Sequence, residues 1–225
     1  MSVNSTQQGP DDAVRHVYVV DDDATIRAEL VDALSLRGFA TRGFVDGEAF
    51  LAEQDDLEPG CLVLDLNLPG VGGIEIQAAL SRAGSPHKIV MLTGAGSVST
   101  AVQALHAGAI DFIEKPFPME GLAKAIGFAL VRLRQDRLEL LHRQEAEQRV
   151  ARLTERERDV LAGLVLGLAN KIIAYRLGLS PRTVETYRAN LMDKLEVKSL
   201  SEAIILARDC GLEPSHRILR ERSSD

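Results

Sequence analysis

Five short apolar runs alternate with segments of helical periodicity between residues 16 and 114, and this alternation constrains the fold more than any other feature of the chain. The apolar runs cover residues 16–20, 39–44, 61–65, 88–92 and 110–114, and the helical segments cover 24–37, 47–54, 73–83 and 98–107. Strands that alternate with helices are joined by right-handed crossovers into a parallel sheet covered on both faces. The pattern therefore predicts an α/β domain built on a five-stranded parallel sheet.

A long helical segment follows this domain. Helical periodicity runs from residue 119 to about residue 153 without a proline, and the apolar stripe becomes mostly polar after Glu145. We interpret residues 131–152 as a helical linker and leave two alternatives open: a seam between two copies of the chain, or a solvated connector after an ordinary terminal helix. No strict heptad is sustained, so a stable coiled coil is not predicted.

The remainder of the chain has an all-helical pattern. Thr154–Glu157 fits a capping box, and Ser180 followed by Pro181 is typical of an N-cap and a first helical position. The later predicted helices cover 170–177 and 181–195, and a fourth starts at Ser199 or Ser201. The chain is thus predicted to contain a flexible tail over 1–14, the α/β domain over 15–130, the linker over 131–152, the helical domain over 153–212 and a charged tail over 213–225.

Composition narrows the class of protein. Cys61 and Cys210 lie far apart without C-x-x-C spacing, which argues against a disulfide framework or a zinc site and suits a reducing cytosol. No apolar run is long enough to span a bilayer, and residues 1–14 lack the apolar region of a signal peptide, so we expect a cytoplasmic protein. Residues 1–130 carry 8 Lys and Arg against 18 Asp and Glu, whereas 131–225 carry 18 against 15, an asymmetry expected of a regulator joined to a nucleic-acid binder.

Charged and polar side chains stand at the ends of the predicted strands. Asp21 and Asp22 end the first strand, Asp65 the third and Thr93 the fourth, while the fifth runs into Lys115. Because the carboxyl ends of parallel strands meet at one edge of the sheet, these groups are expected to converge there. Crowded carboxylates require a cation, and oxygen ligands favour a hard ion such as Mg²⁺. A carboxylate held beside Mg²⁺ can attack a phosphoryl group and form an acyl phosphate.

This arrangement resembles the receiver domain of response regulators. The matching segments are Val19–Asp22, Leu64–Gly70, Met91–Gly94 and Asp111–Pro116. The resemblance implies a flavodoxin-like fold with the strand order 2-1-3-4-5. It also implies that the Lys115–Pro116 peptide bond is cis.

Residue roles follow from the same resemblance. Asp65 would be the phospho-acceptor, and Asp21 and Asp22 would help it to hold Mg²⁺ together with the backbone carbonyl of Asn67. We interpret Asp23 as a helix-start residue and leave it out of the metal site.

Three further residues complete the pocket that the resemblance implies. Thr93 and Lys115 would contact the phosphoryl group, and Phe112 would reorient with Thr93 on activation. A phosphatase of the haloacid-dehalogenase type is an alternative, since it also uses an Asp nucleophile after a strand. That class needs a second Asp two residues on, where this chain has Asn67, so turnover is disfavoured and only slow autophosphorylation and autodephosphorylation are expected.

The helical domain resembles a LuxR-type helix-turn-helix. The matching segments are Thr154–Leu161, Gly167–Ala174 and Leu179–Leu195, and with the receiver the match covers about 17–211 and is most similar to the NarL/FixJ subfamily. In the third helix of the domain, Val184, Leu191 and Leu195 form a buried stripe at helical spacing, which turns Arg182, Glu185, Thr186 and Ala189 outward. The side chains expected to contact DNA are Lys171, Arg182, Thr183, Glu185, Thr186, Tyr187, Arg188 and Lys194.

Tyr187 departs from the family, which commonly has His at this position, but a tyrosine hydroxyl can still donate to a phosphate. Lys171, Arg188 and Lys194 are candidates for phosphate contacts. Between residues 170 and 200 six Lys and Arg stand against three acids, which favours a DNA-binding face.

Together these features predict a two-component response regulator and transcription factor. A histidine kinase would phosphorylate it, the face formed by the fourth helix, fifth strand and fifth helix would then dimerise, and the dimer would bind double-stranded DNA and act on RNA polymerase. A phosphotransfer or protein-interaction adaptor that no longer binds DNA is the main alternative, and the basic character of residues 170–200 disfavours it.

Overall fold

The structure is a computed structural model that describes residues 15–94 and 108–219. The chain divides between Asp136 and Arg137 into two compact units. We call the first the α/β unit and the second the helical unit, and each has its own hydrophobic core.

The α/β unit contains a five-stranded parallel sheet in the order β2-β1-β3-β4-β5, which confirms the expected fold and strand order. Its strands are β1 (His16–Val20), β2 (Ala40–Phe44), β3 (Cys61–Asp65), β4 (Lys88–Thr93) and β5 (Asp111–Glu114). The central strand β3 is buried at every residue, because its side chains alternate between two covered faces.

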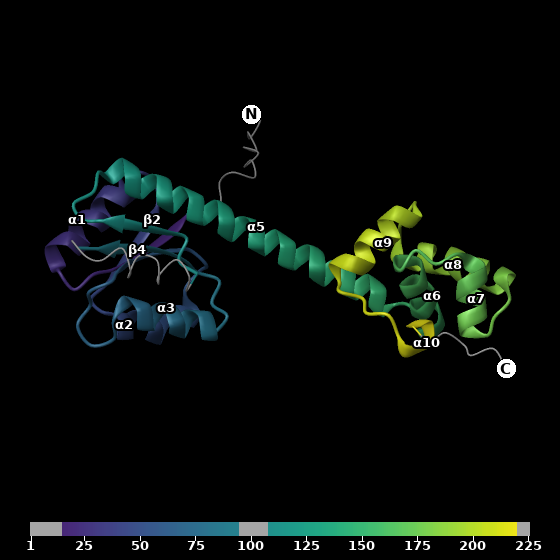
Figure 1. Cartoon of the computed structure of the whole chain (residues 1–225). Coiled ribbons are helices and arrows are strands. Elements are labelled where there is room, and N and C mark those ends of the chain that lie inside the picture. Colours follow the sequence, from purple (N-terminus) through teal and green to yellow (C-terminus); the bar gives the residue numbers. More distant parts are fainter. Residues whose placement is uncertain (1–14, 95–107, 220–225) are drawn as a thin grey trace, which may run out of the picture. The chain divides into compact units, whose positions relative to one another are not determined.

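Helices cover both faces of this sheet (Figure 1). The helices of the unit are α1 (Ala24–Ser35), α2 (Gly47–Glu53), α3 (Gly73–Arg82) and α5 (Met119–Ala151), with the short 3₁₀ helix η1 (Gln54–Asp56) after α2. Leu34 of α1 and Ile126 of α5 pack in one core with Val63 of β3, while Ile76 of α3 packs on the other face with Leu64. The helix expected over residues 98–107 lies outside the described residues.

Helix α5 is a single helix of 33 residues and includes the whole segment interpreted as a linker apart from its last residue. The part of α5 that belongs to the α/β unit is held to the sheet by Asp136. The carboxylate of this residue lies 2.6 Å from the Lys88 ammonium at the start of β4 and 3.0 Å from the Arg132 guanidinium. No helix in the described ranges is long and apolar enough to cross a membrane.

The helical unit comprises the end of α5 together with α6 (Glu155–Val165), α7 (Asn170–Leu177), α8 (Pro181–Leu195), α9 (Leu200–Asp209) and α10 (His216–Leu219). Thr154 and Glu157 form the predicted capping box of α6, and the Ser180 side chain caps α8. Of the two candidate starts for the fourth helix, Ser199 is the N-cap, accepting from the backbone N–H of Glu202.

The C-terminal segment differs from the expectation of a charged tail over 213–225. Residues 216–219 form α10, and Ile218 is fully buried in the core of the helical unit. The guanidinium of Arg176 in α7 donates to the Ile218 carbonyl at 2.7 Å, which ties this segment to the domain. One buried apolar residue in a helix of four residues defines no period, so the sequence pattern did not reveal it.

Candidate functional site

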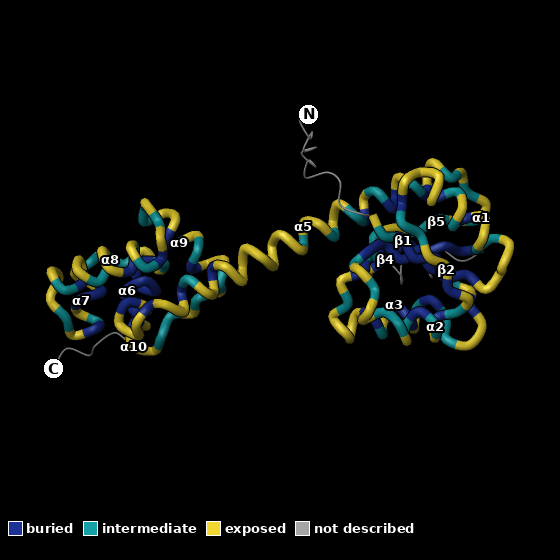
Figure 2. Tube along the Cα trace, turned by 180° about the vertical axis from the view of Figure 1, so that it is seen from behind, coloured by how far each residue is buried: buried dark blue, intermediate teal, exposed yellow. Residues whose placement is uncertain are grey.

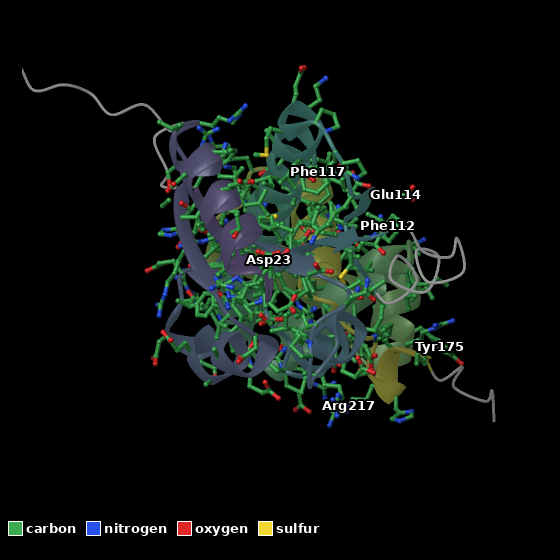
Figure 3. The ribbon with its side chains drawn as sticks, turned by 90° about the vertical axis from the view of Figure 1, so that its left-hand side faces the viewer. Asp23, Phe112, Glu114, Phe117, Tyr175 and Arg217 are labelled. Carbon is green, nitrogen blue, oxygen red and sulfur yellow. The ribbon has the colours of Figure 1, made fainter. Side chains whose placement is uncertain are left out.

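Three carboxylates meet at the carboxyl edge of the sheet. Asp21 and Asp22 follow β1, Asp65 ends β3, and each offers an oxygen within 4.8 Å of the others. Asp21 and Asp65 are buried, whereas Asp22 is exposed. Figure 3 looks onto this edge and labels Asp23 at the start of α1. The structure therefore brings together the three acidic side chains that the sequence placed at the strand ends.

Lys115 reaches the same point from the end of β5. Its ammonium donates to Asp21 Oδ2 at 2.8 Å and to Asp65 Oδ2 at 2.5 Å. The Lys115–Pro116 peptide bond is cis, as expected. One cation thus bridges two carboxylates that come from separate strands.

Burial and pairing shift the pKa values of these groups. Burial raises the pKa of Asp21 above its ordinary value, although the bond to Lys115 acts in the opposite direction. For Lys115, burial lowers the pKa, but the hydrogen bonds to Asp21 and Asp65 outweigh it, so the pKa is raised and the ammonium stays charged. The pocket consequently keeps a positive charge directly beside Asp65.

Backbone groups orient the carboxylates. The N–H of Asn67 donates to Asp65 Oδ1 at 3.0 Å, and the N–H of Asp23 donates to Asp21 Oδ1 at 2.9 Å. The Asp23 side chain accepts from the N–H groups of Thr25 and Ile26, so it caps α1, as the sequence indicated. These bonds leave Asp65 Oδ2 with Lys115 and hold both acids in defined positions.

Arg27 was missed by the sequence analysis. Its guanidinium donates to the carbonyl oxygen of Asp21 at 2.6 Å and thereby holds the loop that carries the first two acids. A cation in the first turn of a helix that follows an acidic loop is a weak signal, because most such side chains are solvated.

Gly73 allows α3 to begin directly against the end of β3. A Cβ at this position would lie 2.7 Å from the Asp65 carbonyl oxygen and 3.0 Å from the Leu66 Cα, both of which are backbone atoms that cannot give way. This close approach packs α3 directly against the backbone of Asp65 and Leu66. Any side chain here would displace the acid.

Thr93 and Phe112 lie on neighbouring strands. Thr93 is buried at the end of β4, and its hydroxyl donates to the Gly94 carbonyl at 2.9 Å. Phe112 is half-buried on β5, paired in register with Met91, two residues before Thr93 (Figure 3). The Thr93 hydroxyl therefore donates to the carbonyl of the residue that directly follows it.

An apolar hollow of about 600 Å³ opens beside Lys115. Its walls come from α1 and from the segment that joins β5 to α5, and include Ile26, Leu30, Ala33, Phe117 and Met119. The hollow lies on the α/β unit next to the lysine that contacts Asp65.

In the helical unit, α8 presents the face that the sequence predicted. Val184, Leu191 and Leu195 are fully buried, and Arg182, Glu185, Thr186 and Ala189 are exposed. Thr183 and Tyr187 are half-buried, and the Thr183 hydroxyl lies 2.7 Å from that of Ser180. The N-terminal turns of α8 thus carry a polar, solvent-facing surface.

Three basic residues expected near DNA differ in their surroundings. Lys171 is exposed, and Arg188 donates to the Asn170 side chain at 2.9 Å. Lys194 donates to the buried Glu157 at 2.7 Å, so its charge is paired within the domain.

Gly178 ends α7 in the left-handed conformation (φ 69°) that starts the turn into α8.

A parallel sheet with an acid cluster and a lysine at its carboxyl edge, followed by a helical domain with an exposed polar helix, is typical of a regulatory protein that joins a receiver to a DNA-binding domain. Comparison with known proteins agrees. Residues 17–127 match the response regulator receiver domain, and residues 151–207 match the bacterial regulatory proteins of the luxR family.

Individual relatives cover nearly the whole chain. It is 42% identical over 197 residues to the transcriptional regulatory protein FixJ of Bradyrhizobium diazoefficiens, covering 88% of this chain and 96% of that protein. It is 41% identical to the FixJ of Rhizobium meliloti, covering 88% and 98%. A low-resolution structure of the response regulator StyR matches with a TM-score of 0.73 and 38% identity over 87% of this chain and 99% of that one. Full-length FixJ from B. japonicum matches with a TM-score of 0.56 and 42% identity over 88% and 98%.

The chain belongs to the two-component response regulators that join a receiver domain to a LuxR-type DNA-binding domain, and it acts as a transcription factor. The receiver implies a histidine kinase as partner, and the LuxR-type domain implies DNA binding. Proteins of this family are in general regulators and not enzymes.

Proposed function

We propose that this response regulator is switched by phosphorylation of Asp65. The observation that carries the proposal is the double contact of Lys115 with Asp65 and Asp21, which leaves Asp65 as a buried, oriented carboxylate beside a fixed positive charge. The backbone bond from Asn67 holds the second oxygen of Asp65. A carboxylate held in this way can attack a phosphoryl group in line.

Transfer of the phosphoryl group to Asp65 is a displacement at phosphorus. A carboxylate oxygen of Asp65 forms a bond to the phosphorus of the kinase phosphohistidine, the phosphorus–nitrogen bond breaks, and the imidazole nitrogen leaves with its electron pair and takes up a proton. Lys115 neutralises charge on the phosphoryl oxygens, and the Thr93 hydroxyl leaves Gly94 to donate to one of them. Asn67 cannot transfer a proton to activate water, so the acyl phosphate persists.

Mg²⁺ is the cofactor that fits the acid cluster. Asp21, Asp22 and Asp65 are hard oxygen donors with ligand atoms within 4.8 Å of one another, and the Asn67 carbonyl would complete the set. When bound, Mg²⁺ would neutralise negative charge on the phosphoryl group. The chain's own residues orient the phosphoryl group, and Lys115 supplies further positive charge.

The response to phosphorylation passes through Thr93 and Phe112. Movement of the Thr93 hydroxyl toward the phosphate releases space that Phe112 fills, and the face that includes β5 and α5 then favours a homodimer. A single phosphoryl group needs to bias such a two-state element by only a few kcal/mol. The dimer binds a roughly two-fold DNA site and acts on RNA polymerase in the cytoplasm.

DNA contacts are assigned to α8 and its surroundings. The exposed Arg182, Glu185 and Thr186 face the bases, which suits the N-terminal turns of a helix that enters the major groove. The phosphate contacts come from the remaining candidates Lys171, Thr183, Tyr187, Arg188 and Lys194, of which Lys194 would first have to leave Glu157.

The kinase partner is proposed to dock on the apolar hollow beside Lys115. The phosphodonor must reach Asp65, and the hollow offers about 600 Å³ lined by Ile26, Leu30 and Phe117 next to the lysine that contacts this acid. An apolar side of a kinase helix would bury itself there while the phosphohistidine faces the pocket.

The decisive experiment replaces the acceptor. Asp65→Asn should remove phosphorylation by acetyl phosphate in the presence of Mg²⁺, whereas the same change at the exposed Asp55 should leave it intact. Intact mass measures the added phosphoryl group, and its release by hydroxylamine identifies an acyl phosphate. Full labelling of the Asp65→Asn protein would refute the assignment.

A further inference from the structure

Arg27, in the first turn of α1, binds the loop that carries the acids Asp21 and Asp22. Its Nη1 donates to the Asp21 carbonyl oxygen at 2.6 Å and to the Asp22 carbonyl oxygen at 3.4 Å. This loop leaves the buried strand β1 and leads to the exposed start of α1 (Figure 2). One nitrogen thus contacts the backbone at both of these consecutive acids.

Gly43 of β2 provides the space for the Arg27 side chain. A Cβ at this glycine would lie 3.1 Å from Cγ of Arg27 and 3.3 Å from its Cδ, so the aliphatic part of the side chain packs closely on β2. The loop has a second tie to this strand, because the Asp21 N–H donates to the Phe44 carbonyl oxygen at 3.4 Å. Arg27 therefore connects the loop to α1 and to β2.

Arg27 and Lys115 are two cations with different partners at this edge of the sheet. Lys115 donates to carboxylate oxygens of Asp21 and Asp65, whereas Arg27 donates to main-chain oxygens of Asp21 and Asp22. The bonds of Arg27 can therefore orient the two acids and leave their carboxylate oxygens to other partners.

We propose that Arg27 is a positioning residue that sets the affinity of the acid cluster for Mg²⁺. The proposal rests on the Mg²⁺ site described above and adds a residue outside the set of ligands. A loop that is already held in one conformation avoids the ordering cost that Asp21 and Asp22 would otherwise meet on binding the ion. Replacement of groups that orient metal ligands changes metal affinity by about ten- to a hundredfold.

Position and charge predict opposite effects of the variant Arg27→Met. This variant retains an unbranched side chain over Gly43 and removes the hydrogen-bond donors together with the charge. If Arg27 acted only as a positive charge near the acids, its loss would strengthen Mg²⁺ binding, because a repulsion between two cations is removed. If Arg27 positions the loop, its loss weakens Mg²⁺ binding. The direction of the change therefore distinguishes the two roles.

The test measures Mg²⁺ binding by the unphosphorylated full chain, from amide NMR shifts during titration with MgCl₂. Arg27→Met should raise the dissociation constant for Mg²⁺ about tenfold. Arg27→Lys keeps the charge but has a shorter side chain, so its dissociation constant should lie between those of the wild type and Arg27→Met. The control is Arg37→Met, which should leave the constant unchanged. Arg37 is exposed, and its Nη1 also donates to a carbonyl oxygen, that of Ala33 at 2.8 Å.

Phosphorylation by acetyl phosphate provides a second readout. Arg27→Met should raise the Mg²⁺ concentration that gives half the maximal rate about tenfold, and the rate at saturating Mg²⁺ should stay within about twofold of the wild-type rate. Unchanged or tighter Mg²⁺ binding by Arg27→Met overturns the proposal, and so does a lower saturated rate with unchanged binding. Either result leaves Asp65 as the acceptor.

Two further outcomes are decided in the same experiments. If Arg27→Met does not fold, as judged by urea unfolding, Arg27→Gln replaces it with the same expected direction and the same contrary results. A wild-type chain that binds no Mg²⁺ overturns the metal site and the role of Arg27 together.

Discussion

At the scale of single residues, His87 shows how burial fixes a protonation state. It is 6% exposed just before β4, its Nδ1 accepts from the Gly60 N–H at 3.1 Å, and its ring lies edge-on to Tyr18 at 5.3 Å. Burial lowers the pKa of His87 below its ordinary value. An accepting Nδ1 requires the neutral ring, so both observations favour the uncharged form in the folded protein.

A pH dependence follows from this shift. Because the unfolded chain binds a proton on His87 more readily than the folded chain does, the free energy of unfolding falls as pH drops below the ordinary histidine value of about 6.5. His87→Asn keeps an acceptor for Gly60 and should flatten this fall between about pH 7.5 and 5.5 in urea unfolding. Gln148→Asn, at an exposed residue that does not titrate, is the control and should retain the wild-type slope. Identical slopes for wild type and His87→Asn would contradict the prediction.

The sequence predicted those residues of the acid pocket that stand at the ends of strands. Asp21, Asp22, Asp65 and Lys115 were expected from their places after apolar runs, and the structure brings all four together. Arg27 was not expected, because nothing local distinguishes its bond to the Asp21 carbonyl from the solvated state of most arginines.

At the scale of elements, α10 shows how a short segment can complete a domain. The luxR-family match ends at residue 207, and α10 lies beyond it. Its Ile218 is buried, Arg217 lies 3.1 Å from Glu155 of α6, and the Ser215 hydroxyl donates to the buried Asp159 at 2.5 Å. These contacts hold α6 and α7, which support the helix assigned to DNA.

Removing the buried side chain of Ile218 should lower the stability of the helical unit. Ile218→Ala deletes a fully buried side chain and should cost about 2–4 kcal/mol of unfolding free energy, whereas Leu219→Ala, at 52% exposure, should change it by less than about 0.5 kcal/mol. Urea unfolding of the full chain measures the loss, and faster amide hydrogen exchange in α6 and α7 locates it. If the two variants behave alike, α10 does not support the domain.

At the scale of the whole molecule, two functions are separable because they use separate residues. In the proposed function, phosphoryl transfer uses an acid cluster in the part of the chain with 18 Asp and Glu against 8 Lys and Arg. DNA contact is proposed for the part with 18 Lys and Arg against 15 acids. Loss of either should leave the other measurable.

This separation predicts two distinct DNA-binding defects. Arg182→Ala with Thr186→Ala should weaken binding to the cognate site about tenfold or more whether or not the protein is phosphorylated. Asp65→Asn should remove only the gain that acetyl phosphate produces. Titrations at two salt concentrations measure both effects, and Arg208→Ala with Ser201→Ala on the exposed surface of α9 is the matched control. Unchanged binding by the α8 variant would exclude this recognition face.

The sequence alone determined the elements and their polarity. Short apolar runs placed the strands, and an apolar periodicity of 3.6 residues placed the helices. Thr154 and Ser180 marked helix starts, and the α8 stripe at Val184, Leu191 and Leu195 was expected and is fully buried. These features depend on side chains a few residues apart, so they can be inferred from neighbours in the chain.

Only the tertiary structure decided which distant groups meet. Lys115 bonds to acids 94 and 50 residues earlier, Lys194 is engaged by Glu157, and Ile218 fills a core built by other helices. The start of the fourth helix at Ser199 was also left open by the sequence. Contacts of this kind depend on how elements pack in three dimensions, and neither propensity nor periodicity of a short segment contains that information.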